Sequence, residues 1–594
     1  MRIFVTFSLL PTPYSLLPTP YSLLPVPCSL WYTIITTMKT PVIAIGLDAA
    51  DPLLLEKWMS QGHLKTLNKI RQQGIYGRLN NTVNYNNKTV EFSSTEPLWV
   101  MFSTGCLPDK TGFWDTIKFY PDTYKVVCDK IYSGYDYKEY NPFYALGDDY
   151  RVAAFDVPVS ALSDQINGLQ ILGWGGHYPF VPSHSQPPEL LPNIIAQYGK
   201  NPVLHKDNGR WWDPVYFKWI QEALKTSIST RSEICRDLLQ REPWDLFVTG
   251  FGETHSAGHD LWDRSQPDHQ LYPYQSKKNG KAGDPMLKIF EAVDDAIAKI
   301  IAAAPKDAYI LCFAVHGMAA NVTDLMSMMF LPELIYRYNF PGKYAITPSK
   351  IGVTPPPPIT RPIRNSWPGE VWRKIYEPNP IKQLFNTWTH KAFLQSGEHG
   401  LLSPYPLMKH NVQLGWMPAT LYSPLWPKMK AFALPAFADG HIRINLKGRE
   451  RDGIVDPSEY DALCDNLTDF LYRLTDGRTG EPLVKQVVRT HNVATDDNPK
   501  LPDADLVVVW NECPTDVVDS PDVGRIGPIT YNRPGGHRAR GFLMASGPGI
   551  TPGSSLPEAH PVDIAPTILT LMGAPIPDYF DGKSLLTPTL SISA

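Results

Sequence analysis

Short apolar runs, each ending at a polar or charged residue, recur along the chain and predict strands that are buried on both faces. Residues 40–48, 244–249 and 308–316 are runs of this kind. Residues 53–73 instead place their apolar side chains at helical spacing, and residues 285–304 predict a second helix. Buried strands that alternate with helices are typical of an α/β fold. We therefore expect a doubly wound, mostly parallel central sheet flanked by helices.

The rest of the chain supplies further elements of the same two kinds. Additional helices are predicted at 97–103, 214–240, 457–475 and 562–573, additional strands at 505–510 and 541–547, and a strand followed by a turn at 440–450. Residues 325–435 differ, because they carry a proline run and many tryptophans with little regular periodicity. We expect this segment to be an insertion, either a cap over the site or a surface for a partner. The α/β core then comprises residues 38–324 and 436–594.

Within the first 37 residues the unit Ser-Leu-Leu-Pro-Thr-Pro-Tyr stands at 8–14 and 15–21 and recurs imperfectly at 22–28, and we expect all 37 residues to be disordered. Tandem copies of the DNA unit TCCCTAC translate into this peptide. Our hypothesis is that repetitive DNA upstream of the gene has been translated and that the native start is Met38. The alternative is a proline-rich export or anchor segment. Mass spectrometry of the native protein distinguishes the two, since peptides from residues 1–37 would exclude the first.

Composition and charge narrow the class of protein. The chain is 43% hydrophobic and 19% charged, which is ordinary for a globular protein. Its formal net charge of −4 shows no excess of positive charge of the kind that binds nucleic acids, so there is no nucleic-acid footprint. No apolar run reaches the roughly 20 residues that span a bilayer. The seven cysteines form no CxxC pair, which favours either a reducing compartment or free buried thiols. We expect a cytoplasmic enzyme, or an exported one if the N-terminal segment is native.

Candidate catalytic side chains gather at the ends of the predicted strands. Asp48, the pair His255/His259 and His316 each follow a buried run, and His537 directly precedes another. A single histidine is more often structural than a ligand. However, the carboxyl ends of parallel strands meet at one edge of a sheet, so these side chains are expected to converge in one crevice. A set rich in imidazoles favours zinc.

Two local patterns refine this expectation. His255 and His259 are four residues apart, so on a helix they lie on one face and could reach one metal ion, although two surface histidines on a loop would have the same spacing. Thr95 closes a run of hydroxyls just before Pro97, near a predicted helix start that favours an anion. Its hydroxyl could be a nucleophile activated by a metal, or an ordinary helix cap.

Six longer motifs give the chain a resemblance to a known family. They are GLDAADP at 46–52, STEPLWVMFSTGCLPDKTG at 94–112, ETHSAGH at 253–259, VHGM at 315–318, GHRARGFLMASGPGI at 536–550 and VDIAPTILTLMGAPIPDYFDGKSLL at 562–586. Together they resemble the type I phosphodiesterase/nucleotide pyrophosphatase branch of the alkaline phosphatase superfamily. The resemblance runs from about Pro41 to Leu586 and implies an alkaline phosphatase-like fold.

The resemblance also implies roles for individual residues. Members of the family use two metal ions, usually zinc, to activate a threonine or serine and to hold the phosphoryl oxygens. By position, Asp48 matches the metal ligand after the first strand and Thr95 matches the nucleophile, which also contacts metal. His259 and His537 match ligands of the first metal, and His316 matches a ligand of the second.

Two positions depart from the family pattern. This chain has His255 and Val315 where the family usually has aspartates. The first site then becomes three imidazoles, His255, His259 and His537, whereas the second keeps only Asp48, His316 and the Thr95 hydroxyl. We expect one tightly bound zinc ion and a second ion that is weak or absent, with manganese as an alternative metal. Three nearby residues could compensate for the missing carboxylates: Asp51, Glu253 and Asn321.

The leading hypothesis is a metal-dependent hydrolase that cleaves a phosphodiester or pyrophosphate bond of a small molecule through Thr95. One alternative is hydrolysis of sulfate esters or phosphomonoesters. Sulfatases of this superfamily usually carry Cys/Ser-x-Pro-x-Arg, and the segment from Thr95 to Trp99 lacks that arginine. The other alternative is a metal-binding protein that has lost turnover, which the changes at His255 and Val315 motivate.

Overall fold

A computed structural model describes most of the chain after the repeats. The described residues are 39–586 without 87, 129–134, 176–182, 207–208, 364–365 and 382–399. The predicted N-terminal tail, residues 1–37, and the proposed start at Met38 lie outside the described residues.

A large mixed sheet forms the centre of the fold. Among the described residues it has nine strands, in the order β21 (Ser554–Ser555), β2 (Ile75–Asn80), β20 (Arg540–Ser546), β11 (Tyr309–Ala314), β1 (Val42–Leu47), β10 (Leu246–Phe251), β7 (Gly147–Phe155), β8 (Ile166–Leu172) and β9 (His184–Gln186). β11, β1, β10, β7 and β8 run parallel to one another, whereas β20 and β9 are antiparallel to their neighbours. The predicted α/β fold with a mostly parallel sheet is therefore confirmed.

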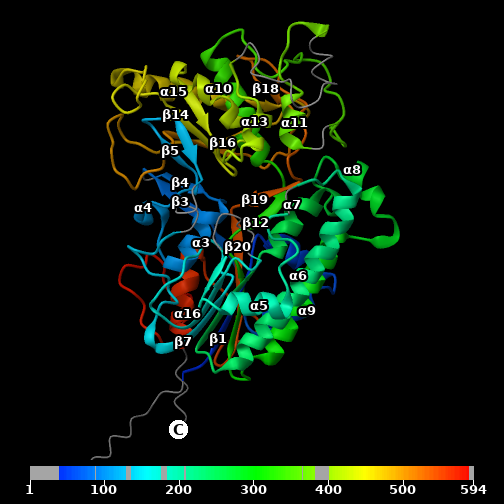
Figure 1. Cartoon of the computed structure of the whole chain (residues 1–594), viewed down its shortest axis with the longest axis vertical. Helices are drawn as coiled ribbons and strands as arrows, with labels where there is room; N and C mark the ends of the chain where they lie inside the picture. The colour runs from blue at the N-terminus through cyan, green and yellow to red at the C-terminus, as the bar shows by residue number, and fades with distance from the viewer. Residues whose placement is uncertain are drawn as a thin grey trace, which may run out of the picture. The chain divides into compact units, whose positions relative to one another are not determined.

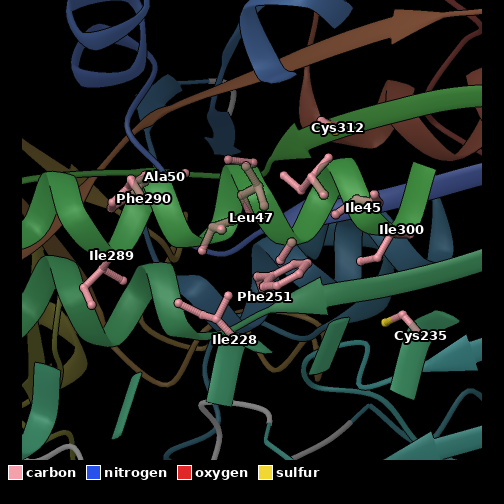
Figure 2. Close-up of a cluster of buried hydrophobic side chains, with 14 of the residues drawn as sticks. Ile45, Leu47, Ala50, Ile228, Cys235, Phe251, Ile289, Phe290, Ile300 and Cys312 are labelled. Atoms are coloured by element: carbon pink, nitrogen blue, oxygen red, sulfur yellow. The ribbon is translucent and has the colours of Figure 1, made fainter. Parts of the chain in front are cut away.

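Helices cover both faces of this sheet. Along β1 the side chains alternate, so that Ile43 and Ile45 enter one hydrophobic cluster while Val42 and Ala44 enter another. The first cluster lies under α6 (Pro214–Arg241) and α9 (Pro285–Ala303); Figure 2 shows side chains of these helices meeting those of β1, β10 and β11. The second lies under α3 (Thr95–Thr104) and α16 (Ile564–Met572), on the opposite side of the sheet in Figure 1. Burial on both faces explains why the central strands are continuous apolar runs.

The amphipathic segment predicted as one helix over 53–73 is two helices. α1 (Pro52–Ser60) and α2 (Lys65–Gln73) are separated by a turn in which Gly62 has φ +86° and Leu64 has φ +50°. Because both values lie in the left-handed region, the backbone cannot continue as one α-helix there. The single-helix prediction was wrong although the apolar stripe was read correctly.

A second module carries its own antiparallel sheet of four strands within the described parts of the chain. The strand order is β13 (Ala431–Leu434), β14 (Gly440–Ile444), β17 (Leu506–Trp510) and β16 (Val484–Arg489), with α10 (Leu331–Asn339) and α15 (Tyr460–Tyr472) beside it (Figure 1). Most residues of one hydrophobic cluster fall between Leu325 and Tyr531, and the others come from earlier in the chain: Ile117, Phe119, Tyr124, Cys128, Trp211 and Leu271. The predicted insertion boundary at 435 stays a prediction, and we propose that the second module extends over 325–531.

Shorter elements complete the chain. The strands are β3 (Thr82–Tyr85), β4 (Lys88–Glu91), β5 (Lys118–Tyr120), β6 (Lys125–Val127), β12 (Gly317–Ala320), β15 (Thr475–Asp476), β18 (Val518–Asp519) and β19 (Gly535–Arg538). The α-helices are α4 (Pro108–Thr111), α5 (Leu190–Tyr198), α7 (Glu253–Ser265), α8 (Tyr272–Gln275), α11 (Trp367–Trp372), α13 (Pro404–Lys409) and α14 (Pro418–Leu421). The π and 3-10 segments are η1 (Ser276–Ala282), η2 (Met326–Phe330), η3 (Ser423–Lys428), η4 (Pro457–Glu459) and η5 (Pro561–Asp563). Along the described parts of the chain, no helix is long and apolar enough to cross a membrane.

A buried carboxyl beside β14 should make stability depend on pH. Asp439 is 6% exposed, and burial, with a further contribution from the charge of Glu91, raises its pKa to about 7. The unfolded chain releases this proton near the ordinary value of 3.8, so the folded state loses stability as pH rises from about 4 to about 7. Asp439→Asn should remove this loss, so the variant should be more stable than the wild type at pH 8 by up to about 4 kcal/mol.

Thermal unfolding of the two proteins across this pH range measures the effect. The difference should shrink toward pH 4.5, where the carboxyl is protonated in the folded state. Asp307→Asn, a change at an exposed carboxyl, serves as the matched control. A difference between Asp439→Asn and wild type that is constant with pH would contradict the expectation.

Candidate metal centre

α7 starts directly after β10 and brings two imidazoles together. Strand β10 ends at Phe251, and the helix runs from Glu253 to Ser265 with every residue buried. The spacing of four residues puts His255 and His259 on one face, with their ring centroids 4.4 Å apart. The helical interpretation of this motif agrees with the structure. The two imidazoles lie at the carboxyl end of a central strand.

His537 reaches the same place from β19. Its Nε2 atom lies 2.9 Å from Nε2 of His255 and 3.0 Å from Nε2 of His259. This close approach depends on Gly535, because a Cβ atom there would lie 2.1 Å from the backbone oxygen of Gly258 in α7. One nitrogen from each of the three rings falls within 4.8 Å of the others, and all three residues are buried.

A backbone contact fixes the orientation of one ring. Nδ1 of His259 lies 2.8 Å from the carbonyl oxygen of Gly535, an acceptor, so the ring donates its proton there. Nε2 of His259 then carries a lone pair that points toward His537. This is the arrangement that metal-ligating histidines show in proteins. The three imidazoles therefore form a preformed site that can hold one cation.

Asp48 and His316 meet beside this cluster. They follow β1 and β11, which are parallel neighbours, and Oδ1 of Asp48 lies 3.2 Å from Nε2 of His316. Trp99 donates its indole N–H to the same Oδ1 atom at 2.9 Å. Oδ2 of Asp48 is buried and has no hydrogen-bond partner among the described residues. A buried carboxylate oxygen in this state is costly unless a cation satisfies it. The ring centroids of His316 and His537 are 4.7 Å apart, so the two groups are continuous.

Thr95 is the first residue of α3 and faces the cluster. Its hydroxyl oxygen lies 3.3 Å from Nδ1 of His537, and the residue is buried. Ser94, not Thr95, occupies the N-cap position, and its side chain makes no capping hydrogen bond. The interpretation of Thr95 as an ordinary helix cap therefore does not hold.

The two departures from the family pattern have different surroundings. His255 stands inside the imidazole cluster and offers a nitrogen in place of a carboxylate oxygen. Val315 is fully buried among apolar side chains and offers no ligand atom. Within the described parts of the chain, the carboxylate of Asp48 lies beside a group of four imidazoles here. A metal bound at this site would keep more of its positive charge than one held by three carboxylates.

Two of the three candidates for compensation are engaged elsewhere, whereas the third keeps an unpaired oxygen. Asp51 caps α1, and its Oδ2 atom pairs with Nε of Arg540 at 2.7 Å. Glu253 pairs with Nε of Arg231 at 3.0 Å. Asn321 donates its amide N–H to the backbone oxygen of Arg533 at 2.9 Å, but its Oδ1 atom is buried without a hydrogen-bond partner among the described residues. The two carboxylates are thus neutralised by arginines, so neither replaces the missing aspartates in this arrangement.

The sequence alone did not reveal two residues that organise the site. Trp99 donates a hydrogen bond to Asp48. It lies four residues after Thr95 on the same helix, so the two side chains share one face, and this spacing could have indicated Trp99 from the sequence. Arg231 is fully buried between Asp156 (3.1 Å) and Glu253, and so fixes the first turn of α7. No local pattern marks Arg231, because its partners lie far away in the sequence.

A comparison with protein-family models agrees with the family resemblance. A family model described as type I phosphodiesterase/nucleotide pyrophosphatase matches residues 42–349, just over half of the chain. A search of curated proteins finds no significant match. Among solved structures, phosphonoacetate hydrolase from Sinorhizobium meliloti 1021, in complex with phosphonoformate, is 13% identical with a TM-score of 0.41, over 90% of this chain and 96% of that one. Murine ectonucleotide pyrophosphatase/phosphodiesterase 5 is 12% identical with a TM-score of 0.41, over the same shares.

Proposed function

The chain belongs to the type I phosphodiesterase/nucleotide pyrophosphatase family and is a hydrolase of that type, and we propose that it cleaves a phosphodiester or pyrophosphate bond with Thr95 as the nucleophile. One metal ion, held by His255, His259 and His537, would support the reaction. The observation that carries the proposal is the convergence of three imidazole nitrogens within 4.8 Å, with the Thr95 hydroxyl 3.3 Å from the ring of His537.

The three histidines fit zinc in number, chemistry and spacing. Catalytic zinc sites use three protein ligands and keep a fourth position for water or substrate, and zinc–nitrogen distances of about 2.0–2.1 Å put tetrahedral ligands roughly 3.3 Å apart. The measured nitrogen separations of 2.9 and 3.0 Å are close to this value. When bound, zinc would polarise a phosphoryl oxygen and lower the pKa of a nearby hydroxyl.

In the proposed reaction, different groups of the chain carry out the attack on phosphorus and the orientation of the substrate. The hydroxyl of Thr95 gives its proton to water, and Oγ1 attacks phosphorus opposite the leaving group. The bond from phosphorus to the leaving oxygen breaks, and that oxygen takes up a proton from water. Backbone N–H groups at the start of α3 orient the non-bridging oxygens. Water then hydrolyses the phosphothreonine, which releases the phosphoryl product and restores the hydroxyl of Thr95.

We propose that the second metal position of the family is weak in this protein. Asp48 and His316 remain as ligands, but Val315 offers none and Trp99 already donates to one oxygen of Asp48. The second oxygen of Asp48 could still take up a cation, so zinc or manganese at high concentration would occupy this position in part. The protein then works with one tight ion and a second that exchanges.

An assay of three esters tests the proposed function. With zinc or manganese present, bis(p-nitrophenyl) phosphate should be hydrolysed at least about tenfold faster than p-nitrophenyl phosphate or p-nitrophenyl sulfate. Stripping the metal should abolish the activity, and added zinc should restore it. The rates are measured as release of p-nitrophenol at fixed pH.

The other outcomes identify the alternatives. A faster rate on the sulfate ester or the phosphomonoester would favour those substrates instead. The segment from Thr95 to Trp99 lacks the arginine of the sulfatase motif, which weighs against the sulfate ester. Tight zinc with no activity on any ester would favour a metal-binding protein that has lost turnover, the candidate that Val315 supports.

A further inference from the structure

A cavity in the second module lies apart from the metal centre. Its volume is about 460 Å³, and its walls come from residues 346–349, the end of α11 with Lys374, and residues 527–529. None of the side chains of the metal centre lines it. Cavities of roughly 300–1,000 Å³ are the size that proteins use for small organic ligands.

The walls of this cavity are tied together by hydrogen bonds. Thr347 donates its backbone N–H and its hydroxyl to the backbone oxygen of Lys374, at 2.8 and 3.0 Å. Ser349 donates its hydroxyl to the backbone oxygen of Gly527 at 3.0 Å. Three segments that are distant in sequence are thus held in fixed positions, so the cavity exists before any ligand enters.

The charges around the cavity leave one cation in excess. Nε of Arg373 pairs with Glu370 at 3.0 Å, and Arg478 pairs with Asp516 at 2.8 Å. Among the described residues, the ammonium group of Lys374 has neither a hydrogen bond nor an ion pair. Burial and the neighbouring Arg373 lower the pKa of Lys374 by more than the charges of Glu370 and Asp516 raise it. Such an ammonium is stabilised by a negative charge placed beside it.

We propose that this cavity binds a small organic anion, one that carries a phosphate or carboxylate group. The anionic group lies against Lys374, whose three N–H bonds are available to it. Proline and isoleucine side chains in the remaining walls contact the organic part of the ligand. This site is independent of the proposed reaction at Thr95.

Labelling with pyridoxal 5′-phosphate followed by borohydride tests the proposal on the intact wild-type protein. The lysine amine attacks the aldehyde carbon, water leaves as the imine forms, and hydride from borohydride reduces the imine to a stable secondary amine. Peptide mapping should show Lys374 labelled at least about fivefold faster than Lys350, an exposed lysine that directly follows the cavity wall at 346–349. Lys374→Gln should remove that labelled peptide, whereas Lys350→Gln should leave it unchanged.

Competition separates an anion site from a merely reactive amine. Phenyl phosphate, benzoate and phenol have the same ring but differ in charge. Protection of Lys374 by phenyl phosphate would identify a phosphate site, and protection by benzoate a carboxylate site. Protection by phenol to the same extent, protection by none of the three, or labelling of Lys374 no faster than Lys350 would each overturn the proposal.

Discussion

Replacing Thr95 by alanine should lower kcat for a phosphodiester by at least about 10³-fold while leaving the bound metal in place, because nucleophile removal in hydrolases has effects of this size or larger. The hydroxyl is the group that faces the imidazole cluster from α3, at 3.3 Å from His537. Its loss removes the attacking atom but none of the three nitrogens. Alanine has the highest helix propensity, so α3 should still form from this position.

The neighbouring hydroxyl provides a matched control for Thr95. Ser94 is the N-cap of α3, and its side chain makes no capping hydrogen bond. Ser94→Ala should therefore keep most of the activity and the full metal content. Initial rates on bis(p-nitrophenyl) phosphate, together with metal analysis of each variant, give both readouts. Full activity in Thr95→Ala, or loss of activity in Ser94→Ala alone, would reject Thr95 as the nucleophile.

Replacing His537 by alanine should remove both the metal and the activity. The Nε2 atom of this residue lies within 3.0 Å of a nitrogen on each of the other two rings, and its Nδ1 atom lies 3.3 Å from the Thr95 hydroxyl. Loss of one of three ligands should weaken zinc binding by at least about 100-fold, since even outer-shell changes cost 10–100-fold. Zinc affinity by competition with a chromogenic chelator measures the change.

A histidine outside the cluster controls for the loss of an imidazole in general. His63 is paired with Glu291 at 2.9 Å on the surface. His63→Ala should leave zinc affinity and activity unchanged, because exposed ion pairs contribute little to stability. Zinc affinity in His537→Ala equal to that of the wild type would remove this residue from the ligand set.

The central strands could be predicted from the sequence because their information is local. β1, β10 and β11 are buried on both faces, so each is a continuous apolar run that a short window of sequence reveals. The convergence of Asp48 and His316 then follows from parallel strand order. The roles of these residues as ligands rest on the family resemblance and stay predictions.

The features that sequence analysis missed depend on pairs far apart in the chain. The hydrogen bond from Trp99 to Asp48 joins α3 to the residue that follows β1. These residues are 51 positions apart, so the spacing of apolar side chains gives no sign of the contact. Arg231 is buried with Asp156 and Glu253, and nothing in the pattern of α6 distinguishes it from a surface arginine. The break at Gly62 preserves the apolar stripe, so side-chain spacing could not reveal it. The cavity beside Lys374 is formed by three segments that are distant in the sequence, so no single stretch of sequence reveals it.

X-ray absorption at the zinc edge, combined with metal counting on the wild-type protein after dialysis against a weak chelator, tests the central claim most directly. That claim is that His255, His259 and His537 bind one ion. We expect close to one zinc ion per chain, with three imidazole nitrogens at about 2.0–2.1 Å. A protein that retains no metal, or a zinc ion whose ligands do not include three imidazoles, would contradict this account of the site.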